Sequence, residues 1–380
     1  MLHLSLIIPC YNEETTITQV LDTLALLDQK ILHGRPIHLE LILALDGSTD
    51  QSWATAQAWA AQHPMLKIIT YTPNRGKGYA IRLGLAQAQG DFIGIQDADL
   101  EYDPAQYLKL LTTLIDNNAD VVYGSRYLIQ DQRRILYFWH SLLNRGLTTL
   151  TNMFTNLDLT DMETCFKLFT KDALQKILPH LQEDRFGIEP EITIQVARQH
   201  LKIYECAITY RPRTYEEGKK ISWRDGLHAL YCILHYGAPC APLPMQIILY
   251  FFIGLTSALA NIAIFGLLYK LAPPHYPMAV LIGSAFVCAA IINYLLCIKI
   301  LFSHATSKVG RELLRYAFVV LGMGSIDYLL TLCGHQYCAL SWMLSKGLTA
   351  PLSFGLNFIF RKYVVFRDDP LPRRTPKAKS

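Results

Sequence analysis

The C-terminal third of this chain is far more apolar than the rest, and this asymmetry limits the folds that are open to it. Across all 380 residues the hydrophobic share is 51%, which is only slightly high. From Met245 to Phe366, however, long apolar runs dominate, whereas residues 1–240 carry charges and turn signals throughout. A helix needs about 20 apolar residues to cross a hydrocarbon core of about 30 Å. The sequence therefore predicts a soluble domain (residues 1–240), a membrane domain (241–367) and a basic tail (368–380).

Four segments of the membrane domain reach spanning length. They also form a repeat, because the pattern around Asn293 recurs around Asn357, and the pattern around Tyr250 recurs around Tyr316. We therefore expect an all-α domain built from two related hairpins. The four segments are Met245–Leu271, Met278–Phe302, Leu313–Cys333 and Trp342–Phe366.

Basic residues predict the orientation of these spans. Lys308 and Arg311 lie between the second and third spans, the tail is strongly basic, and the other two connections are nearly uncharged. Positive charge favours the cytoplasmic side. We expect a multi-pass protein of the plasma or inner membrane, with its soluble domain and C-terminus in the cytoplasm. Asp327 and Lys346 lie within apolar segments, where a charge is a functional hypothesis, but they are equally compatible with mutual pairing, or with Lys346 reaching the outer interface.

In residues 1–240, short strand patterns alternate with helical patterns. This alternation is typical of an α/β fold with a mainly parallel sheet and helices on both faces. Because the first strand begins at once, we expect no signal peptide. The predicted strands are Leu4–Pro9, Leu39–Leu45, Leu66–Thr70, Phe92–Gln96 and Val121–Tyr123, and the predicted helices are Glu14–Leu27, Ser52–Gln62, Gly78–Ala88 and Ala105–Asn117.

Polar clusters follow all five predicted strands. Asp97 and Asp99 share one face of an extended chain, and such a pair suits a hard divalent cation that also holds phosphate oxygens. Each cluster alone is also compatible with ordinary turn chemistry, but five at one edge of a sheet indicate a ligand site. The clusters are Pro9-Cys10-Tyr11-Asn12-Glu13, Asp46-Gly47-Ser48-Thr49-Asp50, Asn74-Arg75-Gly76-Lys77-Gly78, Asp97-Ala98-Asp99 and Gly124-Ser125-Arg126.

Together these motifs, over residues 4–235, resemble the family 2 glycosyltransferases, and more narrowly the dolichyl- and polyprenyl-phosphate mannose and glucose synthases. The apolar region resembles the GtrA-like domain. The resemblance implies a Rossmann-like GT-A fold that transfers one hexose, with inversion, from GDP-mannose or UDP-glucose to a polyprenyl or dolichyl phosphate, as in cell-envelope glycan synthesis. One departure is Leu45, which stands where the family often has an acid.

The resemblance also implies roles for individual residues. Pro9, Tyr11 and Glu13 would hold the base and ribose, with Ala44 and Asp46 on the other side of the base. The implied ligands of Mg²⁺ or Mn²⁺ are Asp97, Asp99 and Glu101. The implied catalytic residues are Asp97, Asp99, Arg126, Arg213 and Lys219. The full nucleotide-sugar set is Pro9, Tyr11, Glu13, Ala44, Asp46, Lys77, Asp97, Ala98, Asp99, Arg126, Arg213 and Lys219.

For several acidic and basic segments, the sequence allows two interpretations. The charge run Arg213–Lys220 is either a solvated loop or a phosphate clamp. Glu189 and Glu191 either orient the sugar or cap a helix, and Asp161-Met162-Glu163-Thr164 has the same ambiguity. No histidine is assigned a chemical role, because a phosphate monoester with a second pKa near 6 arrives largely ionised and needs no base.

Two aromatic-rich amphipathic stretches, about 134–154 and 223–236, precede the first span. They either lie in the headgroup zone of a bilayer or pack against the sheet. The nine cysteines form no C-x-x-C pair, which suggests neither a zinc site nor a disulfide framework.

The expected partners are a nucleotide sugar, a polyprenyl or dolichyl phosphate and the bilayer; nucleic acid is not expected, and a homo-oligomer is compatible with the sequence. Two other functions compete. A processive polysaccharide synthase is disfavoured because no Gln-x-x-Arg-Trp occurs, and a lipid-handling or flipping module with a degenerate transferase half is disfavoured by the intact Asp97 and Asp99. A dinucleotide-binding oxidoreductase is excluded because no G-x-G-x-x-G follows the first strand.

Overall fold

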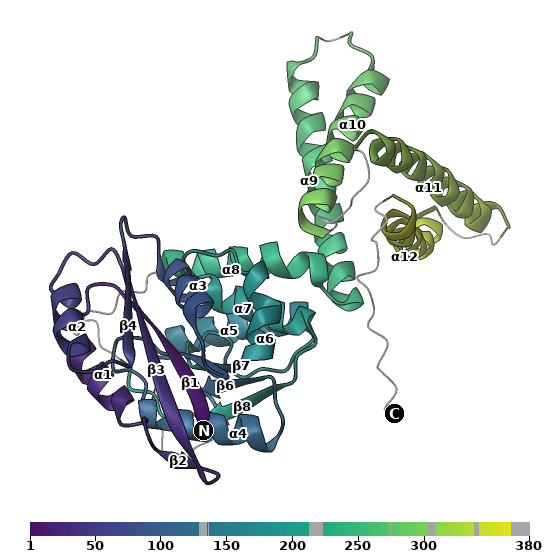
Figure 1. Ribbon diagram of the computed structural model, residues 1–380. Coiled ribbons are helices and arrows are strands. Elements are labelled where there is room, and N and C mark those ends of the chain that lie inside the picture. The colour runs from purple at the N-terminus through teal and green to yellow at the C-terminus, as the bar shows by residue number, and fades with distance from the viewer. Residues whose placement is uncertain are drawn as a thin grey trace. The chain divides into compact units, whose positions relative to one another are not determined.

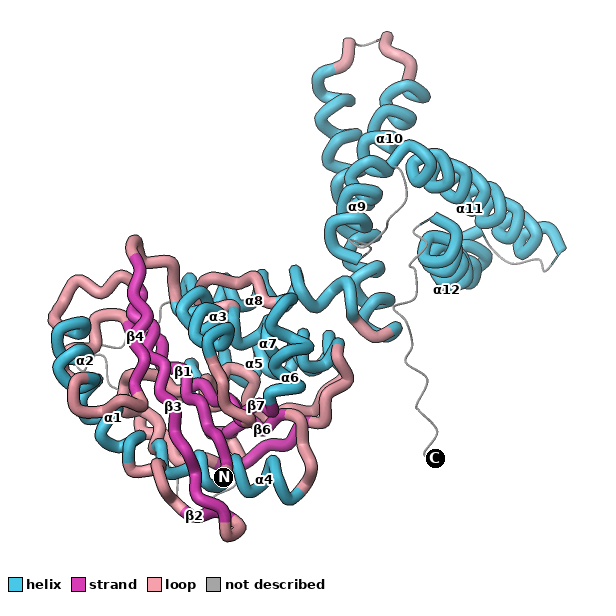
Figure 2. Tube along the Cα trace, viewed as in Figure 1, coloured by secondary structure: helices cyan, strands magenta, loops and turns pink. Residues whose placement is uncertain are grey.

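The protein, seen here as a computed structural model, folds into two compact units, Met1–Pro242 and Leu243–Ser380 (Figure 1). The structure describes residues 1–128, 135, 137–212, 223–273, 275–301, 309–337 and 342–365. In the described residues, the strands lie in the first unit, and the second unit is helical (Figure 2).

The first unit is built on one sheet whose strands run in the order β4-β3-β1-β5-β7-β6-β8. The five predicted strands are present as β1 (Leu2–Cys10), β3 (Arg35–Asp46), β4 (Leu66–Tyr71), β5 (Phe92–Ile95) and β6 (Val121–Ser125). β4, β3, β1 and β5 are parallel to one another, which confirms the α/β fold class.

Three strands were absent from the sequence-based prediction. β2 (Ile31–Leu32) pairs antiparallel with β3, β7 (Lys167–Thr170) runs antiparallel between β5 and β6, and β8 (Ile203–Ala207) is parallel to β6. They are two, four and five residues long. The predicted β5 and β6 are as short as β7 and β8, but their apolar runs lie between clear turn signals, which β7 and β8 lack.

The order of the strands brings three polar clusters together. The chain runs from β1 outward to β3 and β4, then returns to place β5 on the other side of β1. Such a reversal opens a crevice beyond the carboxyl ends of the strands, where ligands bind in open α/β sheets. The register pairs Pro9 with Ala44 and Ile7 with Ile95, so the chain leaves β1, β3 and β5 at the same edge.

Helices cover the sheet (Figure 1). Helix α3 packs on β1 and β3, α4 packs on β6 and β8, and α5, α7 and α8 pack against one another. The helices are α1 (Ile17–Ala25), α2 (Ser52–Ala60), α3 (Lys77–Gln87), α4 (Tyr107–Asp116), α5 (Phe138–Thr155), α6 (Lys171–Ile177), α7 (Ile188–Arg198) and α8 (Trp223–Gly237).

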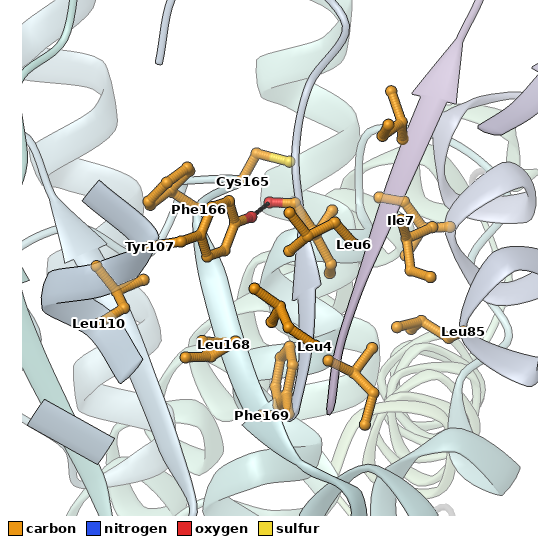
Figure 3. Packing of buried hydrophobic residues seen from close by; sticks show 14 of the residues in the cluster. Leu4, Leu6, Ile7, Leu85, Tyr107, Leu110, Cys165, Phe166, Leu168 and Phe169 are labelled. Atoms are coloured by element: carbon orange, nitrogen blue, oxygen red, sulfur yellow. Dashed lines mark hydrogen bonds between the residues drawn. The ribbon is translucent and has the colours of Figure 1, made fainter. Parts of the chain in front are cut away.

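The buried core holds the end of β5 in place. Figure 3 shows Leu4, Leu6 and Ile7 of β1 among the side chains of the neighbouring elements. The Tyr107 hydroxyl donates a hydrogen bond of 2.7 Å to the carbonyl of Ile95, the last residue of β5. A Cβ at Gly94 would lie 2.6 Å from the Tyr107 ring, so only glycine permits this contact. The acidic turn after β5 therefore begins from a rigid strand end.

The second unit consists of α9 (Leu243–Leu271), α10 (Met278–Leu296), α11 (Val309–Tyr337) and α12 (Trp342–Phe360), with π-helical turns at Cys297–Leu301 and Arg361–Val365. Among the described residues, two helices are long and apolar enough to cross a bilayer, Leu243–Leu271 and Gly283–Leu301, and Leu314–Met323 is a shorter apolar helix. The side chains of Asp327 and Lys346 lie outside the described residues.

All four helices of this unit contribute to one buried polar cluster around Asn293. The Asn293 side-chain amide donates to the Ser257 hydroxyl at 2.9 Å, and its carbonyl accepts from the Tyr316 hydroxyl at 3.1 Å and from the guanidinium of Arg361. Arg361 also donates to the Asn357 carbonyl at 3.1 Å. The repeated asparagines of the sequence therefore meet at one arginine.

Candidate functional site

The acidic turn after β5 has an unusual backbone. Asp97 and Asp99 are half-buried, and Leu100 has a φ of 54°, in the left-handed region that non-glycine residues seldom occupy. The turn is held on its far side, because the backbone N–H of Glu101 donates to Asp99 Oδ1 at 3.2 Å and the Tyr210 hydroxyl donates to Glu101 Oε2 at 2.6 Å. Strain of this kind is often found at functional sites.

Lys77 lies between two carboxylates. Its Nζ is 2.9 Å from Asp97 Oδ1 and 2.9 Å from Glu189 Oε1. Burial alone would lower the pKa of Lys77, but the two carboxylates outweigh burial and hold this pKa well above its ordinary value. The side chain is therefore a fixed cation beside the acidic turn. Lys77 was expected in the site, whereas its ion pair with Glu189 was not, because these residues are far apart in the sequence.

The turn before α3 binds the carboxylate of Asp46. Asp46 accepts hydrogen bonds from the backbone N–H of Arg75 at 2.7 Å, from that of Gly76 at 2.8 Å and from the Asn74 side chain at 2.9 Å. Asp46, at the end of β3, therefore fixes the position of Gly76, the residue directly before Lys77. Gly76 has a φ of 111°, which this turn requires and L side chains rarely adopt.

Arg126, at the end of β6, is anchored by a buried acid. Asp161 accepts from the Nε and Nη2 of Arg126, both at 2.7 Å, and from its backbone N–H at 2.9 Å. Burial alone would lower the pKa of Arg126, but Asp161 outweighs burial and raises it. The Arg126 guanidinium lies 5.1 Å from the centre of the Tyr210 ring, the same tyrosine that holds Glu101. The Tyr210 side chain thus contacts both Arg126 and the acidic turn.

Behind these cations lie carboxyl groups with altered pKa values. Burial, reinforced by Glu189, raises the pKa of Glu163 to about 8, and Glu163 Oε1 is buried without a hydrogen-bond partner. Burial raises the pKa of Glu191 to about 7, although this carboxylate accepts from the backbone N–H groups of Gln182 and Glu183, each at 2.8 Å. Glu191 therefore holds the chain before α7, whereas Glu189 faces the site.

The remaining residues predicted for the site occupy different environments. Pro9 and Ala44 are buried neighbours in the sheet, Ala98 is buried in the acidic turn, and Tyr11 is 41% exposed at the same edge. The Thr16 hydroxyl bridges Glu13 Oε2 at 3.0 Å and the Ala98 carbonyl at 2.8 Å, which joins the turns after β1 and β5. Arg213 and Lys219 lie outside the described residues.

The acidic turn has the chemistry of a hard-cation site, since Asp97, Asp99 and Glu101 offer only carboxylate oxygens on a partly exposed turn. That these residues bind Mg²⁺ or Mn²⁺ stays a prediction. In the described residues, the carboxylates of Asp97, Asp99 and Glu101 are not among the groups whose ligand atoms all lie close to one another. In the part of the chain that the structure describes, one group of three possible ligand atoms lies within 4.8 Å of one another, and it consists of Glu183, His228 and Cys232.

Helices α5 and α8 expose large apolar side chains. Leu143 of α5 lies against Gly226 of α8, where a Cβ would approach it to 3.2 Å, so the two helices are in contact. The predicted stretches 134–154 and 223–236 correspond to these helices, although residues before 138 fall largely outside the described part. Their exposed side chains include Phe138, Trp139, Leu142, Trp223, Leu227 and Tyr231, each at least 50% exposed.

Comparison with known proteins finds two families. Residues 5–178 match the family described as "Glycosyl transferase family 2", and residues 249–366 match "GtrA/DPMS, transmembrane domain". The chain is 29% identical over 230 residues to a dolichyl-phosphate beta-glucosyltransferase of Drosophila melanogaster, covering 58% of this chain and 70% of that protein. It is 27% identical over 217 residues to a dolichol-phosphate mannosyltransferase of Pyrococcus furiosus, covering 57% and 58%.

Among solved structures, the glucosyl-3-phosphoglycerate synthase of Mycobacterium tuberculosis in complex with Mn²⁺, UDP and glucosyl-3-phosphoglycerate aligns with a TM-score of 0.46 at 18% identity. That alignment covers 62% of this chain and 80% of that protein. The chain spans a little over half of the length of the archaeal relative and 70% of the fly relative. The chain thus combines a region that matches the "Glycosyl transferase family 2" model with a C-terminal region that matches the "GtrA/DPMS, transmembrane domain" model.

Proposed function

We propose that this protein transfers one hexose, with inversion, from a nucleotide sugar to a polyprenyl phosphate, and so makes a lipid-phosphate-linked monosaccharide. One observation carries the proposal: Asp97 of the acidic turn lies in contact with a fixed cation, Lys77, at the carboxyl ends of the parallel strands. Relatives named as dolichyl-phosphate glucosyl- and mannosyltransferases support the same reaction. The donor is GDP-mannose or UDP-glucose.

The chemistry requires two anions, the donor diphosphate and the acceptor phosphate, to approach each other. The acceptor is largely ionised at neutral pH, so its oxygen attacks the anomeric carbon while the nucleoside diphosphate leaves. Lys77 and Arg126 reduce the repulsion between the two anions and orient them, and their carboxylate partners keep both cations in place before the reactants bind. When bound, Mg²⁺ or Mn²⁺ at Asp97, Asp99 and Glu101 would neutralise charge on the leaving group.

Arg213 and Lys219 are proposed as further phosphate ligands, on their sequence alone. Pro9, Tyr11, Glu13, Ala44 and Asp46 are proposed as the walls of the base and ribose site. For Asp46 the structure adds a second contribution, because its carboxylate also shapes the turn that carries Lys77.

The acceptor is a lipid, and the exposed face of α5 and α8 is suited to approach a membrane. Trp139 and Trp223 are 76% and 70% exposed, and aromatic side chains of amphipathic helices insert at the headgroup boundary. We propose that this face lies on the cytoplasmic leaflet, with the C-terminal tail on the same side, as the distribution of basic residues predicts.

The test is transfer of radiolabel from GDP-mannose, UDP-glucose and other nucleotide sugars into the organic phase, with polyprenyl phosphate and Mg²⁺ or Mn²⁺ present. Asp99→Asn should lower transfer by about 10²–10³-fold, the range seen when one electrostatic contact to a transition state is lost. Asp91→Asn, an exposed substitution before the amino end of the same strand, is the matched control and should leave the rate unchanged. If no donor labels the lipid, or if Asp99→Asn transfers at the normal rate, the proposed function is wrong.

A further inference from the structure

A second constellation of reactive side chains lies outside the proposed transferase site, between α8 and the segment that precedes α7. His228 Nε2 is 2.9 Å from Glu183 Oε1, Cys232 Sγ is 3.3 Å from Glu183 Oε2, and Sγ is 3.6 Å from His228 Nε2. The three side chains thus form a small triangle, in which His228 and Cys232 contact different oxygens of the Glu183 carboxylate. His228 and Cys232 are four residues apart on one face of α8, and the third group comes from a segment 45 residues earlier.

The size of this triangle matches a metal site. In a tetrahedral Zn²⁺ site with metal–ligand distances of about 2.0–2.3 Å, ligand atoms are about 3.3–3.7 Å apart. The separations of 3.3 Å and 3.6 Å fall in or at the edge of that range, and the 2.9 Å pair would need to widen by a few tenths of an ångström. Because the two contacts of Glu183 are made by different oxygens, its carboxylate would also turn to present one oxygen to the ion, and one atom of each side chain already lies within 4.8 Å of the others. We propose that Glu183, His228 and Cys232 bind a borderline-soft divalent cation of the Zn²⁺ class, with water at the fourth position.

The surroundings support a ligand set rather than a packing accident. The backbone N–H of Arg185 donates to Glu183 Oε1 at 2.9 Å, the type of supporting hydrogen bond that orients metal-bound carboxylates. Gly187 leaves the room for sulfur, since a Cβ there would lie 2.2 Å from Cys232 Sγ. Cys232 is fully buried, while the side chain of His228 is 36% exposed and provides the route by which an ion enters.

The donor types select the cation. Thiolate and imidazole favour Zn²⁺ or Co²⁺, whereas Mg²⁺ and Mn²⁺ prefer oxygen ligands. When the metal–sulfur bond forms, the Cys232 thiol releases its proton to solvent, and no electron is transferred. This cation would therefore differ from the one proposed for Asp97 and Asp99, and both could be present together.

The position of the site suggests what the cation controls. The Glu183 and Asp184 carbonyl oxygens lie so close to Gly78 and Gly76 that a Cβ at either glycine would approach them to 2.5 Å. Asp184 also accepts from the backbone N–H of Tyr79 at 3.0 Å. A cation at the cluster would thus tie α8 to the segment that supports the turn bearing Lys77. We expect it to stiffen that turn.

The experiment uses the full-length protein, purified in detergent, stripped of metal with a chelator and titrated with Co²⁺. Bound Co²⁺ should produce tetrahedral d–d bands and a thiolate-to-metal charge-transfer band at a stoichiometry of about one, and Zn²⁺ should displace it. His228→Gln, a half-exposed substitution that should fold normally, should weaken binding by at least about 10-fold, and Cys232→Ser should abolish the charge-transfer band. The matched controls His235→Gln on the same helix and Cys240→Ser just after it should bind as the wild type does.

The proposal is overturned if the wild type shows no thiolate-to-cobalt band, or if that band survives in Cys232→Ser. It is also overturned if His228→Gln binds Co²⁺ as tightly as His235→Gln; the three side chains would then be a hydrogen-bonded group only. Because the readout is spectroscopic, failure here leaves hexose transfer untouched, and failure of transfer leaves the cobalt result standing.

Discussion

At the scale of single residues, the first unit contains several ionisable side chains whose burial disfavours their charged forms. Lys77 and Arg126 remain charged because carboxylates touch them. Glu163 has no such partner for its Oε1 atom, and burial raises its pKa to about 8. At neutral pH, Glu163 is therefore mainly the neutral acid. Ionisation of Glu163 would place another negative charge near Glu189, which adds to the effect of burial in raising this pKa.

This difference predicts a pH dependence of stability. A carboxyl group whose pKa is higher in the folded than in the unfolded chain stabilises the fold fully below pH 4.5, and this contribution is lost as pH rises through about 8. Glu163→Gln, which cannot ionise, should remove that loss. The gap between variant and wild type should grow from near zero at pH 5 to on the order of a few kcal/mol at pH 8–9, at about 1.4 kcal/mol per pKa unit.

Thermal unfolding midpoints across this pH range check the prediction. Asp158→Asn, an exposed acid-to-amide change in the same unit, is the control and should leave the pH profile unchanged. A gap between Glu163→Gln and the wild type that stays constant from pH 5 to pH 9 would show that Glu163 is ionised in the fold.

At the scale of elements, the turn before α3 depends on close backbone contact with residues 183–185. Gly78 has ordinary helical geometry, so its role is steric: a Cβ there would meet the carbonyl oxygens of Glu183 and Arg185 at 2.5 and 2.9 Å. Backbone cannot retreat as easily as a flexible side chain. The start of α3, and with it Lys77, is therefore positioned by a neighbour more than 100 residues away.

We predict that Gly78→Ala lowers the free energy of unfolding by about 1–3 kcal/mol, the usual cost of overpacking. It should also reduce hexose transfer, because the same shift displaces Lys77. Gly146→Ala in α5 is the matched control: nothing lies within 4 Å of its Cβ, and alanine favours helices by about 0.5–1 kcal/mol, so this variant should be neutral or slightly stabilised. Denaturant unfolding and the transfer assay measure both effects, and equal stability of the two variants would contradict the steric argument.

At the scale of the whole molecule, the chain combines a sheet-based unit with a helical unit, and each has its own buried polar centre. In the second unit, Asn293 joins α10 to α9 and α11 and also contacts Arg361 after α12. Such groups are costly in an apolar interior unless they are paired. We expect this cluster to fix how the two hairpins pack.

Asn293→Leu should therefore destabilise the helical unit, chiefly because Nη1 of the buried Arg361 guanidinium loses its acceptor. Ser257 and Tyr316 also lose a contact to Asn293, but they keep hydrogen bonds to the backbone carbonyls of Ile253 and Ala290. The expected loss is about 1–3 kcal/mol for the one buried group left unsatisfied. Asn261→Leu, on α9 and only half-buried, provides the comparison and should have a much smaller effect. Unfolding is followed in detergent micelles. An Asn293→Leu protein as stable as Asn261→Leu would show that the cluster does not hold the hairpins together.

Local sequence accounted for the elements with strong patterns. The five predicted strand patterns and the helices between them were recognised from apolar runs in regular alternation with helical patterns, and all five of those strands are in the sheet. β7 and β8 were missed because they fall outside that alternation and take their conformation from the strands with which they pair. The pairs Lys77–Glu189 and Arg126–Asp161, and the triad Glu183–His228–Cys232, were missed because ion pairs and ligand sets between distant segments leave no local pattern.

The sequence by itself determined the structural class of each half, since hydrophobic periodicity and run length dictate which surfaces must be buried. It also determined which polar residues directly follow the strands. Tertiary structure alone decided how those residues are combined. It placed Asp46 against the turn before α3, set Lys77 between Asp97 and Glu189, and left the Oε1 atom of Glu163 without a hydrogen-bond partner. The physical reason is that electrostatic pairing depends on distances of a few ångströms in space, which the order of residues along the chain does not specify.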